Sequence, residues 1–194
     1  SFTPGRRSLS FNNIEFLVTF LTMNSIPDTD RSLKILYVCS GNICRSPLAQ
    51  GISEHLLGTD YRHRAIEVES RGTTGYHVGE QVDPRMRETA DRRGITLSHR
   101  ARQVSQQDFL DYDLILAMDK SNYRDLMRIA RTPEFQAKVR MFRDFDPQAE
   151  GDLEVPDPWY GGMNGFERVF EIVYRTCSRL IAEELDLKEA PVRG

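Results

Sequence analysis

A cysteine and an arginine, six residues apart, bracket a short segment that could bind and attack an oxyanion. Cys39 follows an apolar run, 33–38, that predicts a buried parallel strand, and the segment after Arg45 has the apolar spacing of a helix. A loop between a strand and the amino end of a helix turns several backbone N–H groups toward one point, where phosphate fits. A thiol at that point ionises readily to a nucleophile. The planar guanidinium of Arg45 can hold two phosphate oxygens.

Side chains within this segment suit a loop wrapped around a tetrahedral anion. Gly41 supplies backbone freedom, and Asn42 tolerates left-handed geometry and can bond the backbone locally. By loop geometry, the Ser46 hydroxyl is close enough to the Cys39 sulfur to stabilise a thiolate. The expected phosphate-binding loop therefore consists of Ser40, Gly41, Asn42, Ile43, Cys44 and Ser46, together with Arg45.

A carboxylate far along the chain could handle the protons of such a reaction. Asp157 lies in a polar loop that contains prolines, just before Trp159 and Tyr160. A thiolate that takes a phosphoryl group leaves an alkoxide or phenoxide, which needs a proton, and the later hydrolysis needs a group that accepts one from water. Asp157 is placed to do both, with the two aromatic side chains as walls of the substrate rim.

The two motifs together resemble the low-molecular-weight protein tyrosine phosphatases. The pattern Val-Cys-x-Gly-Asn-Ile-Cys-Arg-Ser-Pro, with Asp-Pro-aromatic-Tyr downstream, carries the resemblance, which covers roughly residues 34–187. It implies that Cys39 is the nucleophile, Arg45 the phosphate clamp and Asp157 the general acid and base. It also implies hydrolysis of phosphotyrosine and aryl phosphates through a phosphocysteine intermediate.

Further residues are expected around this centre. By the same resemblance, His99 joins Asn42 and Ser46 in the network that holds the loop in shape, and Tyr76 lies at the rim of the pocket. Asp119 ends a predicted strand, where ligands of α/β proteins gather. It either orients Arg45 or caps the next helix, and the sequence leaves both open.

Three other functions compete with this one. Arsenate reductases resemble the fold but need further cysteines for a disulfide relay, and the chain has none between Cys44 and Cys177. Protein-arginine phosphatases share the loop but carry a small polar residue in place of Ile43, whose apolar side chain suits a tyrosine ring better. A phosphate-binding module without activity would need neither the nucleophile nor the acid.

Cysteine content bears on redox chemistry and metals. We expect reversible oxidation to a Cys39–Cys44 disulfide, because a neighbouring thiol can trap a sulfenic acid. Cys177 lies in an apolar helical run and is predicted to be in the core. No second Cys or His pair has ligand spacing, so neither a metal nor another cofactor is expected. Cysteines in an apparent active site rather than in a disulfide scaffold favour a reducing, cytoplasmic location.

The charge balance and hydropathy restrict the partners. Basic and acidic residues number 26 and 29, so the chain has no basic footprint for nucleic acid. No apolar run is long enough for an integral membrane segment. The expected partner is a phosphotyrosine-bearing protein or a small aryl phosphate.

Predicted strands and helices alternate along most of the chain. This gives one α/β domain in which a four-stranded parallel sheet, in order 2-1-3-4, carries helices on both faces. The Cys39 loop then lies at the switch point where ligands bind. The predicted strands are 33–38, 66–69, 113–117 and 139–142; the predicted helices are 47–57, one between Asp83 and Gly94, a short one opened by 105–108, and 121–130, 133–137 and 164–185.

The ends of the chain fall outside this pattern. Residues 33–188 are the expected phosphatase domain, with 189–194 as a tail. Residues 1–32 are expected to be a dispensable extension. An apolar cluster within 11–21 leaves a second interpretation open, a docking helix for a partner or a membrane surface.

Overall fold

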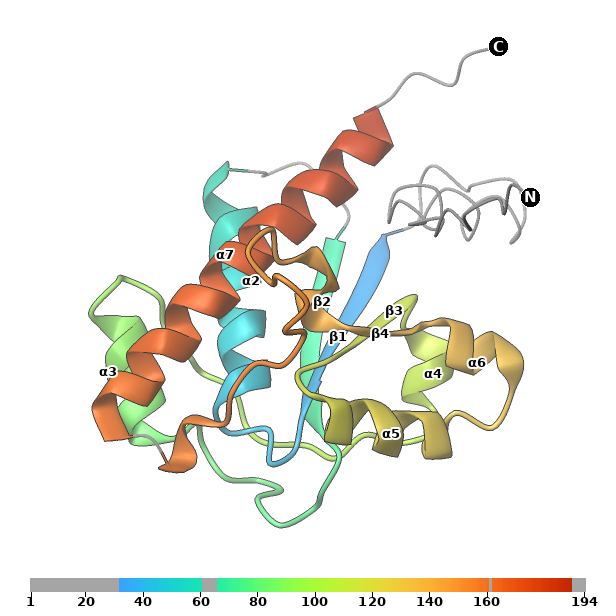
Figure 1. The fold of residues 1–194 in the computed structure, drawn as a ribbon, viewed down its shortest axis with the longest axis horizontal. Helices are drawn as coiled ribbons and strands as arrows, with labels where there is room; N and C mark the ends of the chain where they lie inside the picture. The colour runs from blue at the N-terminus through green and yellow to red at the C-terminus, as the bar shows by residue number, and fades with distance from the viewer. Residues whose placement is uncertain (1–31, 61–65, 161, 190–194) are drawn as a thin grey trace, which may run out of the picture. The chain divides into compact units, whose positions relative to one another are not determined.

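The structure is a computed structural model that describes residues 32–60, 66–160 and 162–189 (Figure 1). The expectations for nearly all of the amino-terminal extension and of the carboxyl-terminal tail lie outside these residues. The elements are β1 (Leu33–Cys39), α2 (Arg45–Asp60), β2 (Ile66–Gly72), α3 (Pro84–Asp91), α4 (Asp108–Asp111), β3 (Leu114–Ala117), α5 (Lys120–Ile129), α6 (Pro133–Ala137), β4 (Val139–Met141), the 3-10 helices η1 (Phe142–Phe145) and η2 (Pro158–Tyr160), and α7 (Gly162–Glu189).

A four-stranded, all-parallel sheet organises the domain, in the order β2-β1-β3-β4. This confirms the predicted α/β class and strand order. Helices α2, α3 and α7 pack together on one side of the sheet, and α4, α5 and α6 lie on the other (Figure 1). In the register of the strands, Cys39 is opposite Gly72 and Val38 is opposite Ala117. The carboxyl ends of the three strands therefore meet where β1 enters the predicted phosphate loop.

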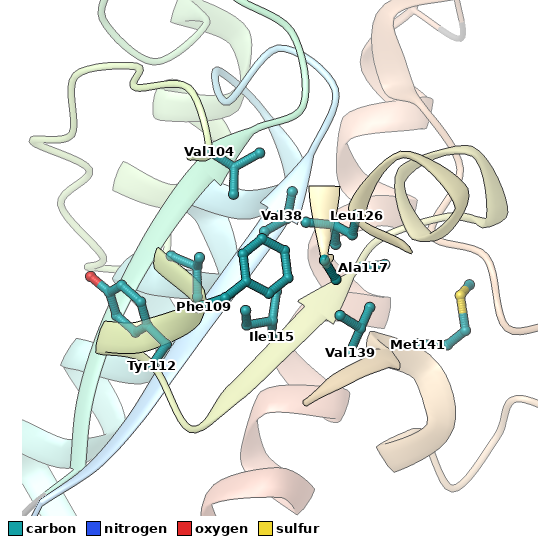
Figure 2. Packing of buried hydrophobic residues seen from close by; sticks show 11 residues of the cluster. Val38, Val104, Phe109, Tyr112, Ile115, Ala117, Leu126, Val139 and Met141 are labelled. Atoms are coloured by element: carbon teal, nitrogen blue, oxygen red, sulfur yellow. The ribbon is translucent and has the colours of Figure 1, made fainter. Parts of the chain in front are cut away.

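Strand β1 is buried on both faces from Ile35 to Cys39, as its largely apolar run predicted. Leu36 and Val38 face the side of α4 and α5, where Phe109 and Ile115 join them in one apolar cluster (Figure 2). Tyr37 faces the other way, and its hydroxyl lies 2.7 Å from the Ser53 hydroxyl of α2. A strand fixed from both faces gives Cys39 a rigid base.

Several element boundaries differ from the sequence-based predictions. Strand β2 runs on to Gly72 rather than ending near residue 69, because it pairs with β1 along the whole length of that strand. Helix α2 begins at Arg45, two residues before Pro47. The segment between the predicted strand 139–142 and the predicted helix 164–185 is partly helical, since it holds all of η2 and most of η1.

The capping of α3 was predicted correctly. Pro84 is its first residue, and the Asp83 side chain accepts the Arg85 backbone N–H at 2.9 Å. Gly94 has a φ of 74° just beyond the end of the helix, as a chain-reversing glycine requires. Within the described residues, no helix combines the length and apolar character needed to cross a membrane.

Candidate active site

The cysteine at the end of β1 lies inside the loop that leads into α2. The Cys39 sulfur accepts the Asn42 backbone N–H at 3.2 Å and lies 3.0 Å from the Ser46 hydroxyl oxygen, the contact that the spacing predicted. Asn42 has a left-handed φ of 57°, which lets the chain turn tightly at this point. The sulfur is thus held at the amino end of a helix among groups that stabilise negative charge.

A single amide side chain holds the loop in this conformation. Asn42 is 1% exposed, and its Nδ2 donates to the hydroxyls of Ser46 at 2.9 Å and Ser70 at 3.0 Å. Its Oδ1 accepts the Arg102 backbone N–H at 2.8 Å and lies 2.7 Å from Nε2 of His99. Because that oxygen can only accept, Nε2 of His99 must carry a proton.

His99 is held in its neutral form. Burial lowers its pKa to about 4, with the positive charge of Arg102 acting in the same direction. A neutral ring with its proton on Nε2 is therefore the form that bonds Asn42 at pH 7. Its location in the network around the loop is the one that the sequence led us to expect.

The guanidinium of Arg45 joins two carboxylates beside the loop. Arg45 is only 3% exposed; its Nη1 donates to Asp119 at 2.6 Å and to the Val155 carbonyl at 3.0 Å. Its Nη2 donates to Asp157 at 3.1 Å. Burial acts to lower the pKa of Arg45, but Cys39 and the two aspartates raise it, so the group stays charged.

Asp119 performs both of the tasks that the sequence left open. One carboxylate oxygen pairs with Arg45, and the other accepts the Asn122 backbone N–H at 2.7 Å as the cap of α5. The Asn122 side chain, fully buried, lies between this carboxylate and the phosphate loop. With the amide nitrogen toward Asp119 at 3.1 Å, its oxygen accepts the Ser40 hydroxyl at 3.0 Å. The sequence reasoning did not include Asn122, although its place one turn after a capping aspartate was a signal.

The loop that carries Asp157 is tied to the end of the sheet. Val155 donates its backbone N–H to the Met118 carbonyl, just beyond β3, at 2.7 Å. Asp157 accepts the Trp159 backbone N–H at 3.0 Å, which fixes the start of η2. The Asp157 side chain is 45% exposed, so it reaches both Arg45 and solvent. A carboxyl group in that position can exchange protons with a substrate and with water.

Aromatic side chains lie near the candidate acid and the loop. Trp159 is 48% exposed and follows Asp157 closely in the chain. Tyr76 is 87% exposed, and its place at the rim of the pocket stays a prediction. His77, to which we assigned no role from the sequence, lies close to Trp159, with ring centroids 6.4 Å apart. A Cβ added at Gly41 would come within 2.9 Å of the His77 ring, so this histidine also borders the phosphate loop. The side chain of Tyr160 is not among those described.

The other loop residues are largely enclosed. Ile43 and Cys44 are buried, and burial raises the pKa of Cys44 well above its usual range, with Asp83 and Cys39 adding to the effect. Cys44 is therefore a neutral thiol beside the nucleophile candidate. Its oxidation to a disulfide stays a prediction. Cys177 is buried in α7, as predicted. In the part of the chain that the structure describes, no three His, Cys, Asp or Glu side chains gather as metal ligands.

Comparisons with known proteins show the family of the chain. Residues 34–190 match the family described as low molecular weight phosphotyrosine protein phosphatase. The low molecular weight protein-tyrosine-phosphatase of Streptomyces coelicolor is 42% identical over 150 residues, 77% of this chain and 92% of that protein.

Solved structures share the fold. A protein tyrosine phosphatase from Entamoeba histolytica superposes with a TM-score of 0.76 at 37% identity, covering 81% of this chain and 99% of that one. A drosophila arginine phosphatase superposes with a TM-score of 0.73 at 31% identity, covering 78% and 98%. The chain therefore belongs to the low molecular weight phosphotyrosine protein phosphatase family.

Proposed function

We propose that this chain hydrolyses phosphotyrosine and aryl phosphates through a phosphocysteine intermediate formed on Cys39. Membership of the phosphatase family supports the activity. The observation that carries the mechanism is the connection of three groups. The Cys39 sulfur lies among donors of its own loop, and Arg45 of that loop is bonded to Asp157 from a loop more than a hundred residues away.

The first step transfers the phosphoryl group to sulfur. The Cys39 thiolate attacks phosphorus, the sulfur–phosphorus bond forms, and the bond from phosphorus to the phenolic oxygen breaks. Asp157, in its protonated form, gives its proton to that oxygen, so a neutral phenol leaves. The guanidinium of Arg45 and the loop N–H groups hold the charge that gathers on the phosphoryl oxygens.

The second step frees the enzyme. The Asp157 carboxylate accepts a proton from water as the water oxygen attacks phosphorus. The sulfur–phosphorus bond breaks, inorganic phosphate forms and the thiolate returns. The Ser46 hydroxyl, 3.0 Å from the sulfur, stabilises the thiolate as a leaving group in this step. Asp157 regains the proton that the next substrate requires.

Replacing the nucleophile tests the proposal. Cys39→Ser should abolish turnover of para-nitrophenyl phosphate while vanadate and phosphate still bind, because the backbone cradle survives and a serine hydroxyl does not ionise there. Binding is measured by calorimetry and turnover by release of nitrophenolate. Cys177→Ala, which removes a thiol far along the chain in α7, controls for loss of a cysteine as such. Turnover of Cys39→Ser within tenfold of the unaltered protein would contradict the nucleophile assignment.

Phosphotyrosine is the preferred substrate in this proposal. A tyrosine ring spans the depth between the loop and the surface and can contact Ile43, Trp159 and Tyr76, whereas a phosphoserine is too short. Each aromatic contact adds about 0.5–1.5 kcal/mol beyond burial, so two contacts give roughly tenfold to a hundredfold selectivity.

The arginine phosphatase among the similar structures makes phosphoarginine the comparison that matters. A panel of matched peptides bearing phosphotyrosine, phosphoserine or phosphoarginine measures kcat/KM for each. We expect phosphotyrosine to lead, and Ile43→Thr to narrow the gap to phosphoarginine. Equal turnover of phosphoarginine and phosphotyrosine would overturn this assignment of substrate.

A further inference from the structure

Arg85, in the first turn of α3, connects segments on both sides of the candidate active site. Its Nε and Nη2 donate to the two carboxylate oxygens of Asp83 at 3.1 and 2.8 Å. Its guanidinium carbon lies 5.2 Å from the centroid of the Trp159 ring and 4.6 Å from that of Phe166. One side chain thus contacts the cap of α3, the loop of Asp157 and the start of α7.

The carboxylate partner of Arg85 is fixed to the phosphate loop. Asp83 is buried, and its backbone N–H donates to the Ile43 carbonyl at 2.8 Å. Its side chain also accepts the Arg85 backbone N–H. The guanidinium is therefore held in a set orientation relative to the loop that carries the nucleophile candidate.

The aromatic partners of Arg85 belong to η2, which follows Asp157, and to α7. Phe166 is fully buried in α7, and a Cβ added at the neighbouring Gly165 would lie 3.5 Å from the Pro158 carbonyl, so η2 rests directly on this helix. Trp159 extends from η2 into partial exposure, and its backbone N–H is the group that Asp157 accepts. A contact that fixes the indole ring of Trp159 therefore also fixes the backbone N–H that donates to Asp157.

We propose that Arg85 is a positioning residue that keeps the Asp157 carboxyl group at the phosphate loop by stacking against Trp159. The inference rests on the proposed role of Asp157 as general acid. Asp157 is on an exposed loop, and its proton must reach one leaving oxygen, so a displacement of about 1 Å can cost about a hundredfold in rate. A planar guanidinium can stack on an aromatic face while it bonds a carboxylate edge-on, which an ammonium group cannot do.

Leaving-group dependence distinguishes this role from a structural one. For aryl phosphates with poor leaving groups, Arg85→Ala should lower kcat/KM about tenfold or more. Substrates with good leaving groups need little help from an acid, so for them kcat/KM should fall by less than about threefold. Arg85→Lys keeps the positive charge but not the planar group. Its kcat/KM should therefore depend on the leaving group as steeply as that of Arg85→Ala. Arg87→Ala is the matched control, because this arginine of the same helix donates to Gln81 instead.

A second variant identifies the group through which Arg85 acts. In an Asp157→Ala background, Arg85→Ala should add no further leaving-group dependence. An equal loss for all substrates, present in both backgrounds, would overturn the inference and place the effect on the phosphate loop through Asp83. A third outcome would overturn only the role of Arg85. In it, Asp157→Ala makes kcat/KM depend more steeply on the leaving group, while Arg85→Ala keeps the dependence of the unaltered protein. A flat response of Asp157→Ala itself would overturn the general acid, and the inference with it.

Discussion

His99 makes the stability of the domain depend on pH through one half-buried ring. Its pKa is lowered to about 4 from an ordinary value of 6.5, so as pH falls the unfolded chain takes up the proton first. The titration of this histidine therefore does not lower the free energy of unfolding above about pH 6.5, and it lowers that free energy increasingly as pH falls from there to about 4. His99→Gln keeps a donor for the Asn42 oxygen but cannot titrate.

We expect the free energy of unfolding to fall more between pH 7 and pH 5 in the unaltered protein than in His99→Gln. Urea denaturation at each pH measures the difference. Parallel pH dependence of the two proteins would contradict the neutral, half-buried state of His99.

Asp157 can be tested with an isosteric change. Asp157→Asn keeps the size of the side chain and an acceptor for the Trp159 N–H, but it has no proton to give. We expect kcat/KM for phenyl phosphate to fall about a hundredfold, the usual scale for a lost general acid. Stopped-time assays of phosphate release measure the change. Activity close to that of the unaltered protein would show that the carboxyl group transfers no proton.

At the residue scale, the sequence predicted the candidate reacting groups but not the side chains that hold them in place. Cysteine, arginine and serine could be recognised because they lie close together within one short loop. The Asn42 side chain instead bonds Ser70 and Arg102, which are 28 and 60 residues away. His77 gave no signal at all, since its proximity to Gly41 and Trp159 arises only from the path of the loop after β2.

At the scale of elements, the close approach of β2 to the phosphate loop gives a sharp test. A Cβ added at Gly72 would lie 2.6 Å from the Ser40 carbonyl oxygen and 3.2 Å from the Asn42 backbone nitrogen. Backbone must then move, so Gly72→Ala should displace the loop and lower kcat/KM about tenfold or more. Assays with para-nitrophenyl phosphate, together with thermal unfolding, measure the effect.

Gly58 near the end of α2 is the matched control. A Cβ added there meets nothing within 4 Å. Gly58→Ala should keep full activity and stabilise the helix by up to about 1 kcal/mol. If Gly72→Ala proves as harmless as Gly58→Ala, the loop tolerates more movement than its contacts indicate.

Gly72 also shows why element boundaries were harder to predict than elements. The alternation of apolar and charged residues in 66–69, Ile-Glu-Val-Glu, predicted a short strand, but residues 70–72 are Ser, Arg and Gly, which have no strand signature. They are extended because β1 offers them partners as far as Cys39. Pairing with a distant strand, not local preference, decided where β2 ends.

At the scale of the whole molecule, we propose that residues 33–188 act as the phosphatase domain without the preceding segment. Within the described residues the first element begins at Leu33, and the match to the family begins at residue 34. Deletion of residues 1–31 should therefore leave kcat/KM unchanged and shift Tm by less than about 2 °C, under about 1 kcal/mol for a domain of this size. Calorimetry and the aryl phosphatase assay test both, and a large drop in Tm would show that the segment packs into the core.

The alternation of strands and helices allowed the global fold to be predicted from the sequence, because parallel sheets restrict the possible connections. The arrangement of the loops at the carboxyl ends of the strands could not be predicted in this way. Arg45 is bonded to Asp157 across 112 residues, and no local pattern encodes that pair.

The Arg45–Asp157 pair has a consequence for the affinity of the protein for phosphate. Asp157 accepts a hydrogen bond from the Arg45 guanidinium, the group proposed to hold the phosphoryl oxygens, so it would compete with a bound phosphate for that arginine. An ion pair with one partly exposed partner is worth about 0.2–1 kcal/mol, so removing this competitor should tighten phosphate binding by up to about fivefold. The inhibition constant of inorganic phosphate should therefore be lower for Asp157→Asn than for the unaltered protein, and a higher value would contradict this competition. In the unaltered protein, the same competition would weaken inhibition by free phosphate whenever the Asp157 carboxyl group is ionised.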